Sequence, residues 1–412
     1  MKNKLLLAVL ALSIVFTACK KNKEEPVAED PFKLGYSNLT VEEHKKNLET
    51  SGLDFMTKVN SMPDEKFIKV MKNLINLELE LESNNMNKMM GVAEGASNKN
   101  IAKILEAVTN NETQKLSDNY GVYTYNATTK KWNITDSKDK LEINFPALEN
   151  QTKNNAKIIM NYVMSGITTT IDDEKLELPK SASAMLLVDG KEEMKFTSAH
   201  EYKADGTPTK TDISLKMGSY IMAFNVANNT EVLTNSFSLS KGTETLFSFN
   251  STGNGNMNVG IADGAKDAAE VVKNANANFE IMNVKFSGIF DIKGFSDNQK
   301  TYEKLPSKLE KNKKEVDGLN KFSQFVVINK TNNSIIAKTE FAAVIRESCY
   351  STWNWNNATQ NYTIEKKCNP SYDWEPRLVF KDGSKLSFEA FKENGFAKLI
   401  KDIEDYGDKF EL

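Results

Sequence analysis

The chain of 412 residues is poor in histidine and cysteine, with two histidines, His44 and His200, and three cysteines. Zinc sites and Ser/His or Cys/His catalytic groups depend on these residue types, so both kinds of site are disfavoured from the start. The motifs H-E-x-x-H and G-x-S-x-G and a Walker-type phosphate loop are all absent from the sequence. We therefore predict no catalytic residue, no metal site and no cofactor, and a protein that is not an enzyme.

The chain also lacks a surplus of positive charge. Lys and Arg number 53 against 56 for Asp and Glu, which gives a formal net charge of −3. Nucleic acid is therefore not an expected partner. Beyond the first residues, no apolar run approaches the roughly 18 residues that a membrane-spanning helix needs.

The N-terminus has the pattern of a secretory signal. Lys2 and Lys4 precede an apolar run over residues 5–16, and the small residues Thr17 and Ala18 lead to Cys19. The run is too short to remain as a helix across a hydrocarbon layer of about 30 Å. The tetrad Phe16-Thr17-Ala18-Cys19 resembles the lipobox of bacterial lipoproteins. That resemblance implies a diacylglyceryl thioether on Cys19, cleavage before it, and acylation of the new amino terminus, so that acyl chains attach the protein to a membrane.

The residues after Cys19 bear on which membrane it is. Lys20 stands where lipoproteins retained at the inner membrane have Asp, so the resemblance implies the outer membrane. Lys23-Glu24-Glu25 is similar to the Lys-acidic-acidic export signal of Bacteroidota lipoproteins, although it is displaced from the cysteine. Both a periplasm-facing and a surface-exposed protein remain open.

The remaining cysteines, Cys349 and Cys368, form an even pair in a chain that we expect to be exported. An oxidising compartment favours one disulfide between them. It would close a loop of about 20 residues and stabilise the fold by roughly 3 kcal/mol on the loop-entropy estimate.

The pattern of apolar residues divides the chain into four parts. We predict a signal peptide (1–18), a tether (19–36), a helical segment (37–117) and a β-rich body with interspersed helices (118–412), whose disulfide-containing part covers about 323–412. The capping box Thr40-Val41-Glu42-Glu43 begins the first predicted helix, a second begins near Ser61, and a third covers 101–108. Residues 84–100, which are polar and contain two glycines, are predicted to be a break.

From residue 118 the spacing changes to alternation. Residues 121–125 and 132–135 flank a polar turn and predict a hairpin, and eight further alternating runs follow between residues 157 and 249. Residues 262–276, 297–322 and 391–403 are predicted to be helical, the second of them with a break at Pro306. The fold class is therefore α+β: N-terminal helices, then a large curved antiparallel β-meander with covering helices. The arrangement loosely resembles the open half-barrel of periplasmic lipoprotein carriers, a resemblance of fold that implies no function.

Two matches to S-x-x-K, at Ser137 and Ser238, and the triplet Ser296-Asp297-Asn298 resemble motifs of penicillin-recognising enzymes. In that family the serine begins a buried helix, so that the lysine lies one turn away. Here both serines lie in turn or strand patterns and no Lys-Thr-Gly accompanies them, so we set this interpretation aside.

Aromatic residues gather around the two C-terminal cysteines. Six of them are candidate binding residues: Trp353, Trp355, Trp374, Tyr350, Tyr362 and Tyr372. Exposed aromatic rings can stack on sugars, anchor a partner or enter lipid headgroups. The alternative is a small aromatic core packed over the disulfide, which we consider the more common arrangement.

The sequence leaves three functions open. The first is a non-enzymatic envelope lipoprotein that binds or carries an apolar or large ligand on its sheet. The second is a surface glycan-binding lipoprotein that uses the aromatic residues around Cys349 and Cys368. The third is a hydrolase with an unrecognised site. The layout of helices followed by a Tyr/Trp-containing hairpin is similar to that of Bacteroidota lipoproteins to which no activity is attached.

Overall fold

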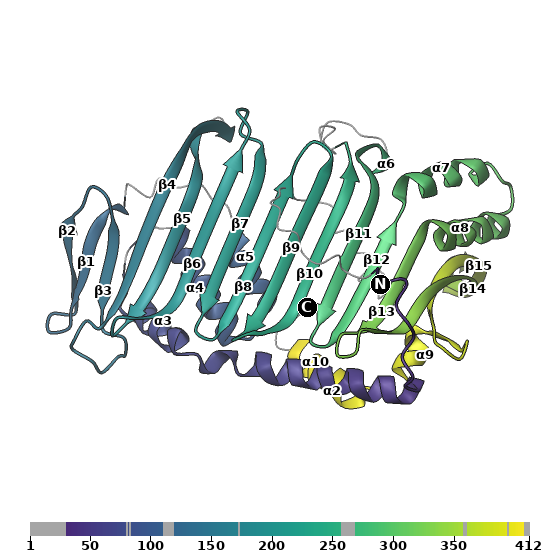
Figure 1. Cartoon of the computed structure of the whole chain (residues 1–412), viewed down its shortest axis with the longest axis horizontal. Coiled ribbons are helices and arrows are strands. Elements are labelled where there is room, and N and C mark those ends of the chain that lie inside the picture. Colours follow the sequence, from purple (N-terminus) through teal and green to yellow (C-terminus); the bar gives the residue numbers. More distant parts are fainter. Residues whose placement is uncertain are drawn as a thin grey trace.

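The computed structural model describes residues 30–407 except 80, 82–83, 110–118, 172–173, 257–267, 357–360 and 394. In this part of the chain, helices are followed by one sheet of 16 strands, so the predicted α+β class is confirmed. Strand neighbours follow the chain from β16 to β3, and β1 and β2 complete the sheet. The sheet stays open, with β2 at one edge and β16 at the other (Figure 1).

The described helices are short apart from the first. Their bounds are α2 (Val41–Asn60), the 3-10 turn η2 (Met62–Asp64), α3 (Lys66–Asn76), α4 (Asn84–Ser97), α5 (Ile101–Thr109), α6 (Ala268–Val271), α7 (Ile292–Tyr302), α8 (Lys308–Phe322), α9 (Phe388–Lys392) and α10 (Ala397–Gly407). The capping box at the start of α2 is confirmed, because Thr40 accepts from the Glu43 amide while Glu43 accepts from the Thr40 amide.

The strands form a meander. Their bounds are β1 (Gly121–Asn126), β2 (Lys131–Asp136), β3 (Leu141–Phe145), β4 (Ala156–Ile171), β5 (Glu174–Val188), β6 (Lys191–Tyr202), β7 (Pro208–Met217), β8 (Tyr220–Asn228), β9 (Val232–Lys241), β10 (Glu244–Gly255), β11 (Val272–Ile281), β12 (Val284–Phe290), β13 (Ser323–Asn329), β14 (Ser334–Asn356), β15 (Asn361–Val379) and β16 (Lys385–Ser387). Neighbours are antiparallel except β1 and β3, which pair in parallel because the β1–β2 hairpin lies outside β3.

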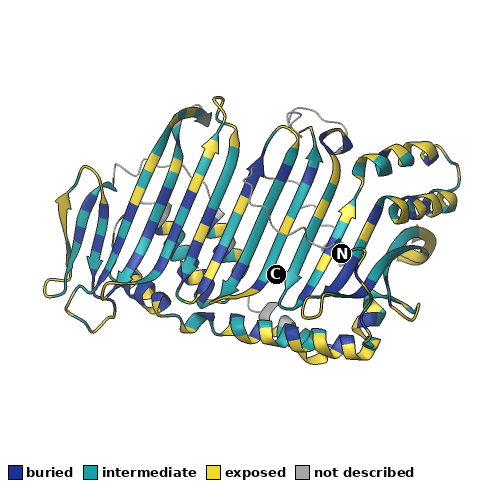
Figure 2. Cartoon of the chain, in the orientation of Figure 1, coloured by how far each residue is buried: buried dark blue, intermediate teal, exposed yellow. Residues whose placement is uncertain are grey.

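One face of the sheet packs against helices. Side chains of α3, α4 and α5 form a single apolar cluster with alternate residues of β3–β10. Phe67 of α3 and Phe196 of β6 are among its fully buried members. Figure 2 shows buried residues alternating with more exposed ones along these strands, as expected for a sheet with one covered face.

The predicted break at 84–100 is wrong, because most of it forms α4. Met86, Met89 and Val92 recur at helical spacing and are buried against the sheet. The two glycines allow α5 to approach closely: a Cβ on Gly91 would lie 2.9 Å from the Ala107 Cβ, and one on Gly95 would lie 2.8 Å from Ile104 Cγ1.

Two other predicted elements differ from the structure. Only Ala268–Val271 is helical within the predicted helix 262–276, its residues 262–267 lie outside the described part, and strand β11 begins at Val272. The alternation of Ala with Asn there supplies the period of a strand. The predicted closing helix is divided into α9 and α10 around Gly395, whereas the predicted break of 297–322 at Pro306 is confirmed between α7 and α8.

The end of the predicted tether packs on the body. Leu34 lies in an apolar cluster with Val326, Ile328 and Ile335. Tyr36 pairs in parallel with Ile335 of β14, and the Ser37 amide donates to the Ile335 carbonyl at 2.8 Å. The described end of the tether therefore lies beside β14.

No described helix combines the length and the apolar character needed to cross a bilayer.

Candidate functional site

The longest hairpin of the molecule extends beyond the rest of the sheet. Strands β14 and β15 pair continuously from Lys338 with Val379 to Asn356 with Asn361, and Figure 1 shows them curling away from the sheet beside α8. Residues 346–356 and 361–371 make up what we call the arm. Its described side chains are exposed, with only Thr352 half-buried.

Four apolar or aromatic side chains lie at the end of the arm. Trp353 faces Ile364 across the ladder and Trp355 faces Tyr362, so all four lie on one face and form what we call the tip cluster. They are 65%, 59%, 51% and 58% exposed, respectively. The Tyr362 ring meets both tryptophans edge to face, with centroids 6.3 Å from Trp353 and 4.9 Å from Trp355.

The structure separates the other candidate aromatic residues from this cluster. Tyr350 is exposed but pairs with Lys367 on the opposite face of the arm. Tyr372 and Trp374 share the face of the tip cluster but lie near the base, where both are half-buried. There Trp374 meets Phe341 edge to face with ring centroids 5.4 Å apart. The sequence located the aromatic segment correctly. In the structure, however, the six aromatic residues do not form one core over the disulfide.

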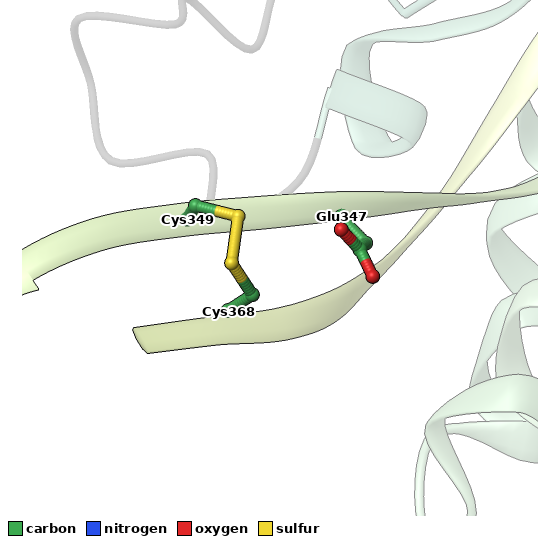
Figure 3. Close-up of side chains that lie close together, drawn as sticks. All are labelled: Glu347, Cys349 and Cys368. Carbon is green, nitrogen blue, oxygen red and sulfur yellow. A yellow bond between two sulfur atoms is a disulfide. The ribbon is translucent and has the colours of Figure 1, made fainter. Parts of the chain in front are cut away.

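The predicted cysteine pair lies nearer the base of the arm than its tip, at the fourth of its eleven cross-strand pairs. Cys349 and Cys368 are direct cross-strand partners with their sulfur atoms 2.08 Å apart, at bonding distance. Glu347 lies beside them, as Figure 3 shows, and its carboxylate is within 4.8 Å of both sulfurs. Cysteine binds a metal ion as the thiolate, which a disulfide does not offer. Glu347, Cys349 and Cys368 are therefore not a metal site while the disulfide is intact.

The base of the arm is fixed by α8. The Asn320 amide group donates to the Phe341 carbonyl at 2.8 Å and accepts from the Phe341 amide at 2.7 Å. The Asn320 side chain therefore pairs with β14 as the backbone of a neighbouring strand would, at a position that the ladder between β13 and β14 does not reach. Asn312 donates to the Asp373 carbonyl at 2.9 Å on the other strand of the arm. Helix α8 therefore holds Phe341 of β14 and Asp373 of β15, next to the residues where the arm begins.

A second surface lies on the face of the sheet opposite α3–α5. Across β7–β11 this face carries short residues, which we call the polar face: Ser214, Ala223, Asn225, Thr234, Ser236, Ser238, Ser248, Asn250, Thr252, Asn276 and Asn278. No described helix packs on it. Charged pairs stand at its margins, with Lys210–Asp212 at 2.5 Å, Lys216–Glu192 at 2.9 Å and Lys285–Glu280 at 3.9 Å.

The side chains of the polar face bond to one another across the strands. Asn225 donates to Ser236 at 3.2 Å, and Asn278 donates to Asn250 at 2.9 Å. An amide or hydroxyl group can form more bonds than these pairs use. Between its charged margins the surface therefore offers many groups that can form hydrogen bonds with a ligand, and Ile221, which is 38% exposed, adds one large apolar side chain to the same face.

The helix-covered face continues past α3–α5 as a row of phenylalanines. Phe237, Phe247, Phe279 and Phe286 follow one another across β9–β12 with ring centroids 4.9–5.6 Å apart. Phe286, the last of them, is 36% exposed. This row is an apolar strip rather than an enclosed pocket.

The remaining candidates for chemistry lie apart. The two histidines are in α2 and β6, and burial lowers the pKa of each. Ser238 and Lys241 of one S-x-x-K match point to opposite faces of β9, because three residues along a strand reverse the direction. A depression of about 580 Å³ between α2 and the β10–β11 region is lined by polar residues including Asp54, Glu244 and Lys330, and neither histidine nor either serine of the S-x-x-K matches lines it.

Comparison with protein-family models, with curated proteins and with solved structures found no match to this chain.

Proposed function

We propose that this protein is a lipid-anchored, non-enzymatic binding protein of the bacterial outer membrane, held by acyl chains on Cys19. The signal pattern and the lipobox-like tetrad that ends at Cys19 support the anchor. The stretch from Cys19 to Asp30 is long enough to hold the body up to about 40 Å from the membrane when fully extended.

The anchor has a direct test. Metabolic labelling with a fatty-acid analogue labels the wild-type protein and not Cys19→Ala, and the variant no longer partitions into membranes. Labelling or membrane partition that survives in Cys19→Ala contradicts the anchor.

We further propose that the polar face binds a neutral, hydroxyl-rich polymer, that is, a polysaccharide. The observation that carries this proposal is a wide, flat surface of hydroxyl, amide and methyl groups with its charges at the margins. Nucleic acid would need a cationic surface. An apolar ligand would need apolar area, which lies on the other face of the sheet and is largely filled by α3–α5.

The binding test is co-sedimentation with insoluble cellulose, chitin and β-1,3-glucan. We expect the wild type to sediment with at least one of them, and Ser236→Lys/Ser238→Lys to stay in solution because two long charged side chains lift the polymer off the face. Thr135→Lys, on the exposed strand β2, is the matched control and keeps binding. Equal sedimentation of all three proteins, or of none, contradicts the proposal.

The phenylalanine row favours a second candidate, an apolar ligand carried along β9–β12. Phe286 leaves over a third of its side chain accessible at the end of that row. Native mass spectrometry after gentle purification tests this candidate. A bound lipid that is lost in Phe279→Ser/Phe286→Ser supports it, and a protein that carries no lipid contradicts it.

A further inference from the structure

The arm has the surface chemistry of a membrane-interface element. Residues 350–364, which include its end, contain no charged residue, although 26% of the whole chain is charged. The exposed tip cluster consists of two tryptophans, one tyrosine and one isoleucine. Tryptophan and tyrosine are enriched where protein meets lipid headgroups, because each ring has an apolar body and a polar atom.

The charges that border this uncharged end differ between the two faces of the arm. Glu365 and Lys367 form an ion pair at 3.3 Å on the face opposite the tip cluster. Lys366 lies on the face of the tip cluster, two residues closer to the body than Ile364, at a step of about 7 Å along the strand. With Ile364 among the upper acyl chains, the Lys366 ammonium lies at the level of lipid phosphates. Ion pairs follow nearer the base, such as Arg346–Asp373 at 3.0 Å.

The arm is also stiff enough to present its end. An isolated two-stranded hairpin is only marginally stable in water. Here the disulfide joins the strands near the base of the arm, and Asn320 of α8 holds Phe341 of β14. Exposed apolar side chains on a braced hairpin, rather than on a loose loop, favour a contact surface.

The tether meets the strand that leads into the arm. Lys338, where the β14–β15 pairing begins, donates to the Phe32 carbonyl at 3.4 Å, and Tyr36 pairs with the same strand. Residues 347–356 extend the arm by about 30 Å at roughly 3.4 Å each. The stretch from Cys19 to Asp30 spans about 40 Å at most. The arm begins at Arg346, eight residues or about 27 Å further along β14 than Lys338. The tip therefore reaches the membrane that holds Cys19 when the arm lies inclined to the bilayer rather than upright.

We propose that the arm inserts its tip cluster into the headgroup region of the membrane that holds Cys19, as a second attachment point that fixes the orientation of the sheet. This inference rests on the proposed lipid anchor. One acyl-chain attachment leaves the body free to turn on its tether, whereas a second point of attachment limits that rotation.

The test uses the lipidated full-length protein in vesicles of phosphatidylethanolamine and phosphatidylglycerol whose acyl chains are brominated near the headgroup. Bromine quenches tryptophan fluorescence at close range. Trp132→Phe/Trp374→Phe keeps only the tryptophans of the tip, and Trp353→Phe/Trp355→Phe keeps only the two remote from it. We expect quenching and a shift of emission to shorter wavelength in the first variant and neither change in the second.

Three other results overturn the proposal. Tip tryptophans that stay unquenched show that the arm remains in water. Quenching in both variants shows that the body lies flat on the bilayer. Tip tryptophans that respond to cellulose, chitin or β-1,3-glucan, or a dimer in light scattering that Trp353→Ala/Trp355→Ala abolishes, together with no quenching by lipid, assign the tip to a glycan or to a second copy of this chain.

Failure of the anchor is seen separately, by vesicle flotation. A wild-type protein that does not float contradicts the acyl chains on Cys19. The quenching measurement is then repeated on Cys19→Ala at high vesicle concentration. Quenched tip tryptophans in that protein support the arm without the anchor, and unquenched ones contradict it.

Discussion

The sheet between β3 and β10 and the arm formed by β14 and β15 use the same antiparallel ladder but are stabilised differently. In the first region α3–α5 bury one face of the strands in a continuous core. In the second, beyond Arg346, nearly every described side chain is exposed, and the ladder is supplemented by one disulfide. In the covered sheet, burial therefore limits which residues each inward position can hold. In the arm, the large aromatic side chains are exposed and are not needed for packing.

The largest effect is expected from opening the core. Phe67 is fully buried in α3, and Phe67→Ala leaves a cavity that lowers the free energy of unfolding by about 3–5 kcal/mol. Denaturant titration measures the loss. The control is Ile134→Ala on β2, whose side chain is 61% exposed and whose removal changes stability by no more than about 0.5 kcal/mol. Similar losses in both variants contradict the division into a buried and a displayed region.

The next effect is confined to the arm. Cys349→Ser/Cys368→Ser removes a crosslink worth about 3 kcal/mol on the loop-entropy estimate. Because the arm contributes little to the core, we expect faster amide exchange over 346–356 and 361–371 and an almost unchanged unfolding midpoint of the body. Hydrogen exchange followed by mass spectrometry separates the two. Exchange that accelerates equally in β3–β10 contradicts the independence of the arm.

The smallest effect depends on pH and belongs to the body alone. Burial lowers the pKa of His44 and, with help from Lys88, that of His200 below the ordinary 6.5. The unfolded chain then takes up protons more readily than the folded one, so stability is constant above about pH 6.5 and falls as the pH drops below it. Unfolding at pH 7.5 and 5.0 measures the loss, and His44→Gln reduces it. The arm has no histidine, so its local exchange follows only the ordinary pH dependence of amide chemistry.

Local signals in the sequence predicted the elements that local chemistry determines. The capping residues Thr40 and Glu43, the break at Pro306 and the hairpin around residues 126–131 were all read correctly. Helix α4 was missed because its polar residues and two glycines hide a buried face of Met86, Met89 and Val92. The glycines that suggested a break instead allow α4 and α5 to pack closely.

The site was predicted in part for a similar reason. The sequence indicated the cysteine pair and the aromatic residues around it, yet it did not predict one continuous hairpin that contains them. Continuous pairing of β14 with β15 depends on the cross-strand register, which places Trp353 and Trp355 with Tyr362 but sends Tyr350 to the other face. The polar face was not predicted, because its residues come from five strands and share a surface only once the register is known. The alternation of Ser and Asn with apolar residues along those strands was the available signal.

The thermal unfolding midpoint of Trp353→Ala/Trp355→Ala tests most directly whether the tip cluster is displayed or packed. Both side chains are more than half exposed, so we predict that the midpoint stays at the wild-type value within error. A midpoint that falls as far as that of Phe67→Ala would contradict this account and would show that the aromatic residues serve the fold.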